Sequence, residues 1–337
     1  MMDQKRAPVL LCVAIWILLA FVWPAELRAA PMKKVRAAFT SFSYAQPPFW
    51  IAKELKLFDK YGLDAELIYI SGAKAIAALL GGSIDVAQVS AAATLSAASR
   101  GADLAILGSN FTRLVFFIHA VPQIKEVADL RGKVLGMGSF GSNPHLAALV
   151  LLSKMGLVPN KDVGLVAVAG GDPAILAALQ QGKIQAGLLT PPTTTMAERL
   201  GFREIFDIAS LNFPFPIAST VSTRRFIAAN PDTTLNILRS SAEAIYLYRT
   251  RPDLTLPAVA KYVRVSRDDP SLIQSHQLYG KHFNQTLAPP LDGIKFILDF
   301  IAEQTPSVKG KQPADFIDLS FVKKLEEEGF FRRLSGP

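Results

Sequence analysis

The sequence predicts an α/β protein with two lobes, each a mainly parallel sheet flanked by helices. Short apolar runs alternate with amphipathic stretches from residue 34 onward, and such alternation calls for a parallel sheet covered on both faces. The chain has 337 residues, 50% of them hydrophobic, which suffices for two domains of ordinary size. The segments 71–90 and 171–190 match at an offset of 100 residues, which indicates two lobes of similar topology.

The first lobe is predicted from the order of its apolar runs and glycine stops. A helix over 47–62 has an apolar stripe and ends at Gly62. The other elements are expected as strands over 34–40, 63–70, 83–90 and 103–109, and helices over 73–82 and 91–101.

The second lobe is expected to open after one long strand, "RLVFFIHAV" (113–121), and the chain to return through "PIASTVSTRR" (216–225). From Asn230 the pattern is almost wholly helical, so these helices would pack on the first lobe or across the junction. The predicted division is a signal peptide over 1–30, lobe 1 over 31–119, lobe 2 over 120–217, and a return to lobe 1 over 218–337.

The N-terminus is typical of a secretory signal, which predicts a periplasmic protein. Lys5 and Arg6 precede the apolar run from Pro8 to Trp23, and small residues follow near Ala30. An uncleaved membrane anchor is the alternative, because the run approaches the length of a spanning helix. The single cysteine, Cys12, lies inside this run, so a chain starting near Pro31 can form no disulfide and has no cysteine nucleophile.

The formal net charge is +8, without a dense basic run. This indicates a mild bias toward anionic partners and gives no sign of nucleic-acid binding.

The motif "GKVLGMGSFGSNP" raises the question of a dinucleotide cofactor, because Gly136, Gly138 and Gly141 have the spacing of that fingerprint. The fingerprint also needs an acidic residue at the end of the second strand to hold the ribose. Asp162 precedes that strand and Asp172 lies too far along the chain. We therefore expect no cofactor, and interpret the loop as a helix N-terminus suited to a small anion or polar group.

No catalytic constellation or metal spacing is visible in the sequence, so we expect neither an enzyme nor a metal site. Ser139 lacks the glycine two positions before it that a nucleophile elbow requires. The histidines are scattered and are expected to be solvated or packed. They are His119, His145, His276 and His282.

Polar, glycine-rich loops follow six of the predicted strands. Such strand ends converge on the ligand crevice in open α/β sheets, although ordinary βα turns favour the same residues. Six such loops in an exported two-lobed protein favour a ligand cleft. The loops are "SFSYAQPPFW", "SGAK", "QVSAAA", "GSFGSNP", "AGGDP" and "LLTPP".

Several longer passages resemble the periplasmic solute-binding proteins of ABC importers, in the sulfonate, nitrate, taurine and thiamine-precursor (NMT1-like) family. The resemblance covers essentially the whole chain after the predicted signal. It is carried by "PPFWIAKELKLFDKYGLDAELI", "AALLGGSIDVAQVS", "VADLRGKVLGMGSFGSNPHLAALVLLSKMGL", "DPAILAALQQGKIQAGLLTPP" and "DLSFVKKLEEEGF".

The resemblance implies a type II periplasmic-binding-protein fold whose lobes close on a small ligand. It implies a membrane permease as partner and a monomeric protein, with ligand positions on the matched loops. The segment Ser139–Ser142 would hold the head group, and Phe49, Phe140 and Tyr44 would cover the apolar part. The implied positions are Ser43, Tyr44, Gln46, Phe49, Gly72, Ala73, Ser90, Ala91, Ser139, Phe140, Gly141, Ser142, Thr190 and Pro191.

Departures from the family pattern narrow the expected ligand. Many relatives have Trp-Asp-Pro where this chain has Leu189-Thr190-Pro191, so a cationic ligand loses an expected partner. The cysteines of the enzymatic branches are absent as well. The leading hypothesis is a binding protein for a small anionic or polar molecule, such as a sulfonate or aromatic carboxylate. An exported enzyme on the same scaffold and a ligand-presenting sensor are the alternatives.

Overall fold

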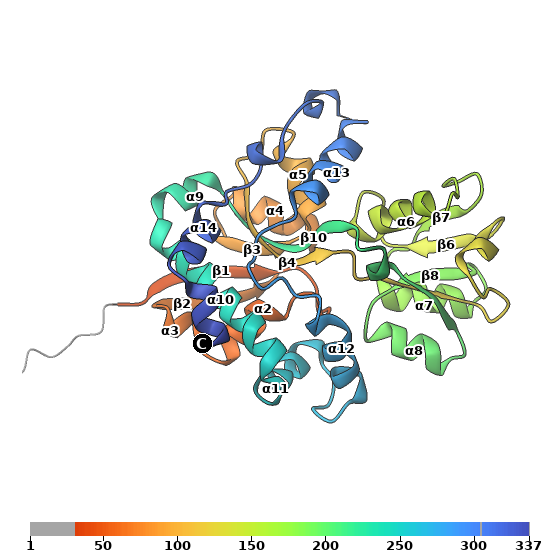
Figure 1. Ribbon diagram of the computed structural model, residues 1–337, viewed down its shortest axis with the longest axis horizontal. Coiled ribbons are helices and arrows are strands. Elements are labelled where there is room, and N and C mark those ends of the chain that lie inside the picture. The colour runs from red at the N-terminus through yellow and green to blue at the C-terminus, as the bar shows by residue number, and fades with distance from the viewer. Residues whose placement is uncertain (1–30, 304, 337) are drawn as a thin grey trace, which may run out of the picture. The chain divides into compact units, whose positions relative to one another are not determined.

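The computed structural model describes residues 31–303 and 305–336. From Met32 onward the chain forms one compact unit, which contains two five-stranded sheets (Figure 1). The predicted signal peptide, residues 1–30, lies outside the described residues. No helix in the described ranges combines the length and apolarity needed to cross a membrane.

The sheet of lobe 1 has the strand order β2-β1-β3-β10-β4. β1 is parallel to β2 and β3, whereas β10 is antiparallel to both β3 and β4. Its strands are β1 (Lys33–Phe39), β2 (Leu63–Tyr69), β3 (Val86–Val89), β4 (Ala105–Arg113) and β10 (Pro214–Ser222). Helices within its first segment are α2 (Pro47–Glu54), α3 (Leu57–Lys60), α4 (Gly72–Leu80) and α5 (Ala91–Ala98).

The sheet of lobe 2 has the order β7-β6-β8-β5-β9, which repeats that of lobe 1. β6 is parallel to β7 and β8, and β5 is antiparallel to β8 and β9. Its strands are β5 (Phe117–Ala120), β6 (Val134–Met137), β7 (Gly164–Ala167), β8 (Ala186–Leu189) and β9 (Arg203–Asp207). Its helices are α6 (Asn143–Lys154), α7 (Asp172–Gln180) and α8 (Thr193–Arg199), with 3₁₀ turns at Val127–Leu130 and Ile208–Leu211.

The two-lobed α/β architecture predicted from the sequence is confirmed: in each sheet four strands run in one direction, and one strand, β10 or β5, runs against its two neighbours. β5 and β10 are the strands next to the lobe crossings, and they run against the βα units beside them. The run 113–121 was predicted as one strand, which is wrong. It contains the end of β4, a break at 114–116, and β5 in the other sheet.

The sequence match at an offset of 100 residues corresponds to equivalent elements in the two lobes. α4 and α7 begin 100 residues apart, and so do β3 and β8. The connections contain Gly82 and Gly182, whose φ angles of 70° and 68° are in the left-handed region that favours glycine. The match therefore reflects two copies of one helix–turn–strand unit.

The chain after β10 is helical, as the sequence predicts. α10 packs on α2 and α3, and α13 packs on β10 and α5 (Figure 1). The helix predicted over 47–62 is divided, because Lys56 has a left-handed φ of 54° between α2 and α3. The C-terminal helices are α9 (Arg224–Ala229), α10 (Pro231–Thr250), α11 (Pro252–Val263), α12 (Pro270–Gly280), α13 (Leu291–Ala302), α14 (Ser320–Glu327) and α15 (Phe330–Ser335), with 3₁₀ turns at Pro306–Val308 and Pro313–Asp315.

Candidate functional site

A cavity of about 290 Å³ lies where strand-end loops of both lobes meet. We call it the cleft cavity. A volume of this size suits a small ligand, since ligand pockets begin at roughly 300 Å³. Lobe 1 and the helices after it contribute Thr40, Ser41, Ser43, Ala45, Gln46, Ser90, Ile217, Ala218 and Tyr279; the crossing contributes Val115 and Phe116; lobe 2 contributes Asn143, Pro144, Asp172 and Thr190.

The loop after β1 supplies hydroxyl groups to the cleft cavity. The Oγ atoms of Ser41 and Ser43 are 2.9 Å apart, and the Thr40 hydroxyl donates to the carbonyl of Gln88 at 3.0 Å. The side-chain carbonyl of Gln46 accepts from the backbone N–H of Thr40 at 3.4 Å. The loop is thus tied to itself and to β3, and it presents its hydroxyls on a fixed backbone.

Ser90 connects the two lobes. It ends β3 and caps α5, where its Oγ accepts from the N–H of Ala93 at 3.4 Å. The same hydroxyl donates to Oδ1 of Asn143, the first residue of α6, at 2.9 Å. Two helix N-termini from different lobes therefore meet at one hydrogen bond. Such termini carry backbone N–H groups without helical partners and favour negative charge.

Asp172 supplies the carboxylate of the cleft cavity. Its Oδ2 accepts from the backbone N–H of Thr190 at 2.7 Å and from the Thr190 hydroxyl at 2.5 Å. Burial raises the pKa of Asp172, and the two donations from Thr190 oppose that rise. The pair fixes the end of β8 against the start of α7, so the Thr190 side of the cavity is preorganised.

The rest of the lining is apolar. Val115 and Phe116 come from the crossing between β4 and β5, and Ile217 and Ala218 come from β10. Ala218 has a φ of 52°, an unusual conformation for a residue with a side chain. Strained backbone of this kind is concentrated at ligand sites, where the surrounding structure holds it in place. The Tyr279 hydroxyl donates to the carbonyl of Val115 at 3.3 Å and closes this wall.

Four of the residues implied by the resemblance line the cleft cavity, namely Ser43, Gln46, Ser90 and Thr190. Ala91 and Pro191 follow two of them directly and are buried. Gly72 opens α4 and does not line the cavity, and Ala73 is the next residue of that helix.

Tyr44 and Phe49 do not line the cleft cavity. Both side chains are fully buried, and the Phe49 ring packs edge-on against Phe58 at 5.8 Å. Phe49 belongs to α2, whose first six residues are all buried, and Tyr44 lies in the loop before that helix.

The segment 139–142 lies at a neighbouring cavity of about 390 Å³, which Phe140 and Gly141 line together with His145. The N–H of Gly141 donates to Nδ1 of His145 at 3.0 Å, so this donor is already used. The Phe140 side chain is 60% exposed and Ser139 is exposed as well. Ser142 caps α6 without a side-chain hydrogen bond. None of the four lines the cleft cavity, where the following residue, Asn143, takes that place.

The residues that the sequence reading missed fall in two groups. Thr40, Ser41, Asn143 and Asp172 lie on or next to the loops expected to converge, so the loops indicated their region. Asp172 was considered only as a ribose ligand. The residues Phe116, Ile217 and Tyr279 sit in apolar or helical stretches that carry no such signal.

Two lobes with a cavity between their strand ends define the class as a two-lobed solute-binding fold of the periplasmic binding protein type. The model of the NMT1-like family matches residues 28–263, and the chain belongs to that family. The resemblance found in the sequence is thereby confirmed.

Individual relatives agree with this assignment. A Brachyspira hyodysenteriae protein described as an ABC transporter periplasmic binding protein is 27% identical over 215 residues, which cover 59% of this chain and 61% of that relative. The chain thus matches about three fifths of the relative's length. The periplasmic aliphatic sulphonate binding protein of Escherichia coli is similar in structure, with a TM-score of 0.67, 21% identity and coverage of 83% of this chain and 90% of that chain.

The alkanesulfonate-binding protein of Xanthomonas axonopodis pv. citri, solved bound to MOPS, also has a TM-score of 0.67, at 18% identity and with coverage of 87% and 100% of the two chains. Similarity at this level of identity establishes the shared fold.

Proposed function

We propose that this protein captures a small anionic or polar organic molecule, sulfonate-like or carboxylate-bearing, in the cleft cavity and delivers it to an ABC importer. The observation that carries the proposal is the cleft cavity itself, about 290 Å³ in volume and lined from both lobes. Closure of the lobes around a ligand would bury it among hydroxyl groups and helix N-termini.

The lining favours hydrogen bonding over salt bridges for the ligand's head group. Among the described lining residues there is no Lys, Arg or His, while Ser41, Ser43, Ser90 and Thr190 offer hydroxyls. A sulfonate or carboxylate would accept from the Ser41–Ser43 pair and from the N–H groups at the start of α5, because the hydroxyl protons of Ser90 and Thr190 are already donated to Asn143 and Asp172. The apolar wall at Phe116 and Ile217 suits the organic part of the same molecule.

Asp172 limits the orientation of such a ligand. Because its carboxylate already accepts twice from Thr190, an anionic group placed beside it would be repelled whenever Asp172 is ionised. We infer that the head group lies at the Ser90 side, and that a donor group or a neutral part of the ligand lies at the Asp172 side.

Binding is proposed in preference to catalysis. The ionisable side chains among the described lining residues are Asp172 and Tyr279; Oδ2 of Asp172 accepts from Thr190, and the Tyr279 hydroxyl donates to the carbonyl of Val115. Product analysis by mass spectrometry after incubation with bound candidates separates the two functions. Turnover of a bound candidate would replace the binding proposal with the exported enzyme.

The test of ligand class is thermal unfolding of refolded, ligand-free protein beginning at Pro31. The panel contains aliphatic sulfonates, aromatic carboxylates, nitrate and pyrimidines. A ligand at 100 times its dissociation constant stabilises the folded state by about 2.7 kcal/mol, which gives a clear shift. A hit confined to the pyrimidines, which are neutral near pH 7, would overturn the sulfonate or carboxylate assignment. Delivery is tested by ligand-dependent uptake in cells that carry a candidate permease, with the Thr190→Val variant as the comparison.

A further inference from the structure

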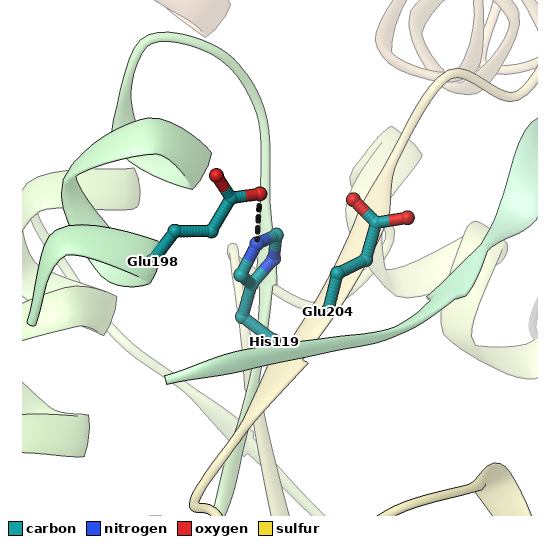
Figure 2. A group of neighbouring side chains, drawn as sticks. All are labelled: His119, Glu198 and Glu204. Atoms are coloured by element: carbon teal, nitrogen blue, oxygen red, sulfur yellow. Dashed lines mark ion pairs between the residues drawn. The ribbon is translucent and has the colours of Figure 1, made fainter. Parts of the chain in front are cut away.

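His119 is a fully buried histidine whose two ring nitrogens make no hydrogen bond in the structure. It lies on β5, which pairs with β8 on one side and β9 on the other. The nearest polar partner is Oε1 of Glu198, 3.6 Å from its Nε2 (Figure 2), and this distance is too long for a hydrogen bond. Buried polar atoms are normally satisfied, so an imidazole left in this way needs an explanation.

Two glutamates from different elements approach the same ring. Glu198 is on α8 and Glu204 is on β9, and Figure 2 shows both carboxylates directed to the region of the imidazole. One ligand atom of each residue lies within 4.8 Å of the others. Among the described residues, neither glutamate forms a salt bridge with a lysine or arginine.

A β-bulge creates this arrangement. Ile118 pairs with Phe206, but the next pair is His119 with Glu204, so the register shifts by one residue at Ile205. Directly paired residues of an antiparallel ladder lie on one face of the sheet. Without the bulge, Ile205 would lie opposite His119. Bulges commonly redirect a side chain in this way.

The three donors match the ligands of a divalent transition-metal ion. Zn²⁺ binds imidazole nitrogen and carboxylate oxygen at roughly 2.0–2.2 Å, which sets tetrahedral donors about 3.4 Å apart. In the structure the three ligand atoms lie within 4.8 Å of one another. Both glutamates are exposed, so rotation of their side chains can shorten these distances to the values that a metal requires. A nitrogen donor in the set disfavours Mg²⁺ and Ca²⁺, which take oxygen ligands.

The electrostatics agree with this donor set. Burial lowers the pKa of His119, which favours the neutral ring, and Glu198 opposes that shift. Burial, together with the charges of Asp207 and Glu198, raises the pKa of Glu204. A bound cation would relieve the repulsion between these carboxylates.

We propose that His119, Glu198 and Glu204 form a site for a divalent transition-metal ion, with Zn²⁺ as the probe. The ion would tie β5, α8 and β9 together. Because α8 begins three residues after Thr190, it would also brace the lobe 2 wall of the cleft cavity. This proposal stands apart from the ligand proposal, since none of the three residues lines that cavity.

The experiment is a calorimetric titration of ZnCl₂ into the protein beginning at Pro31, after removal of metal with EDTA. We expect one site. Glu198→Gln and Glu204→Gln should each weaken it at least about tenfold, since loss of even an outer partner of a metal ligand costs roughly 10–100-fold. Both changes are at exposed side chains and keep the shape of the residue. Unaltered circular dichroism would show that these variants are folded.

Two matched controls separate this site from adventitious binding. Glu66→Gln changes an exposed glutamate on β2, and His282→Asn removes a histidine from another part of the chain; both should leave Zn²⁺ affinity unchanged. Co²⁺ provides a second readout, because a nitrogen and oxygen site gives visible absorption bands that His119→Asn should abolish. Absence of Zn²⁺ binding, or binding unaffected by both glutamate changes, would overturn the proposal.

Discussion

Ser90 and Thr190 occupy equivalent positions in the two lobes and both line the cleft cavity. Each residue directly follows the third strand of its sheet's βα series, β3 in one lobe and β8 in the other. They are also the last residues of the two segments, 71–90 and 171–190, that match in sequence. The two matched segments therefore both end at the cleft cavity. The two hydroxyls have different partners, since Ser90 reaches Asn143 of the other lobe and Thr190 reaches Asp172 of its own.

Thr190→Val should weaken binding of whichever ligand the panel identifies by about 1 kcal/mol, through loss of a hydrogen-bonding hydroxyl at nearly constant volume. Calorimetric titration measures the change. Thr250→Val is the control, because the Thr250 hydroxyl donates to the carbonyl of Tyr246 in its own helix. The ligand affinity of this variant should equal that of the unaltered protein. Equal affinities for both variants would remove Thr190 from the ligand site.

The hydrogen bond between Ser90 and Asn143 should contribute to lobe closure. In a double-mutant cycle of Ser90→Ala and Asn143→Ala on ligand affinity, we expect a coupling energy of about 0.5–1.5 kcal/mol, since the bond joins the lobes. Ser83→Ala replaces Ser90→Ala in the control cycle, because Ser83 is exposed and bonds to its own lobe. Strictly additive effects in the first cycle would mean that this contact does not couple closure to binding.

Asp172 should make folding stability depend on pH. Burial raises its pKa in the folded state above the unfolded value. The folded protein then holds the proton more tightly than the unfolded chain, so the contribution to stability is full below about pH 3.9 and is lost as pH rises through the folded pKa. Asp172→Asn removes this dependence and keeps an oxygen to accept from Thr190.

Urea unfolding of both proteins from about pH 3.5 to about pH 8, a range that begins below the unfolded pKa, checks this expectation. The free energy of unfolding of the unaltered protein should fall relative to that of Asp172→Asn as pH rises. A constant difference across the series would show that the carboxyl has the same pKa in both states.

Gly293→Ala should destabilise the protein by about 2–3 kcal/mol, because overpacking a close contact is costly. A Cβ at Gly293 in α13 would lie 2.5 Å from the carbonyl oxygen of Pro214 and 2.8 Å from Cα of Phe215, both backbone atoms of β10. Gly280→Ala at the end of α12 is the control. Its Cβ would meet only the His276 ring at 3.7 Å, and it should be neutral or slightly stabilising. Urea unfolding of the two variants measures the difference, and equal stabilities would show that β10 can shift away from α13.

The sequence predicts the elements well where a local pattern encodes them. The chain from Asn230 is predicted to be almost wholly helical and begins there with α10, and the repeated unit is found in both lobes. The break between β4 and β5 was missed, because 114–118 is continuously apolar and no glycine or proline marks the crossing. The sequence pattern of a single buried strand does not differ from that of two consecutive buried strands in different sheets.

The site was predicted by region and only partly by residue. Loops at strand ends converge because of the topology, so Ser43, Ser90 and Thr190 were within reach of the sequence. Phe49 was assigned to the ligand, but the orientation of α2 depends on packing that the sequence pattern does not reveal. The histidine and two glutamates were not linked, because their ligand atoms come together only through β5–β9 pairing and a bulge.

The position of β10 has a consequence for the order of assembly. β10 lies between β3 and β4, which are not paired with each other, so the sheet of lobe 1 remains in two pieces until residues 214–222 arrive. All five strands of the other sheet lie within residues 117–207 and are complete before that point. As the chain emerges from its N-terminal end, the inserted lobe can therefore mature first. The sheet of lobe 1, although it contains the first strand of the described chain, is completed last.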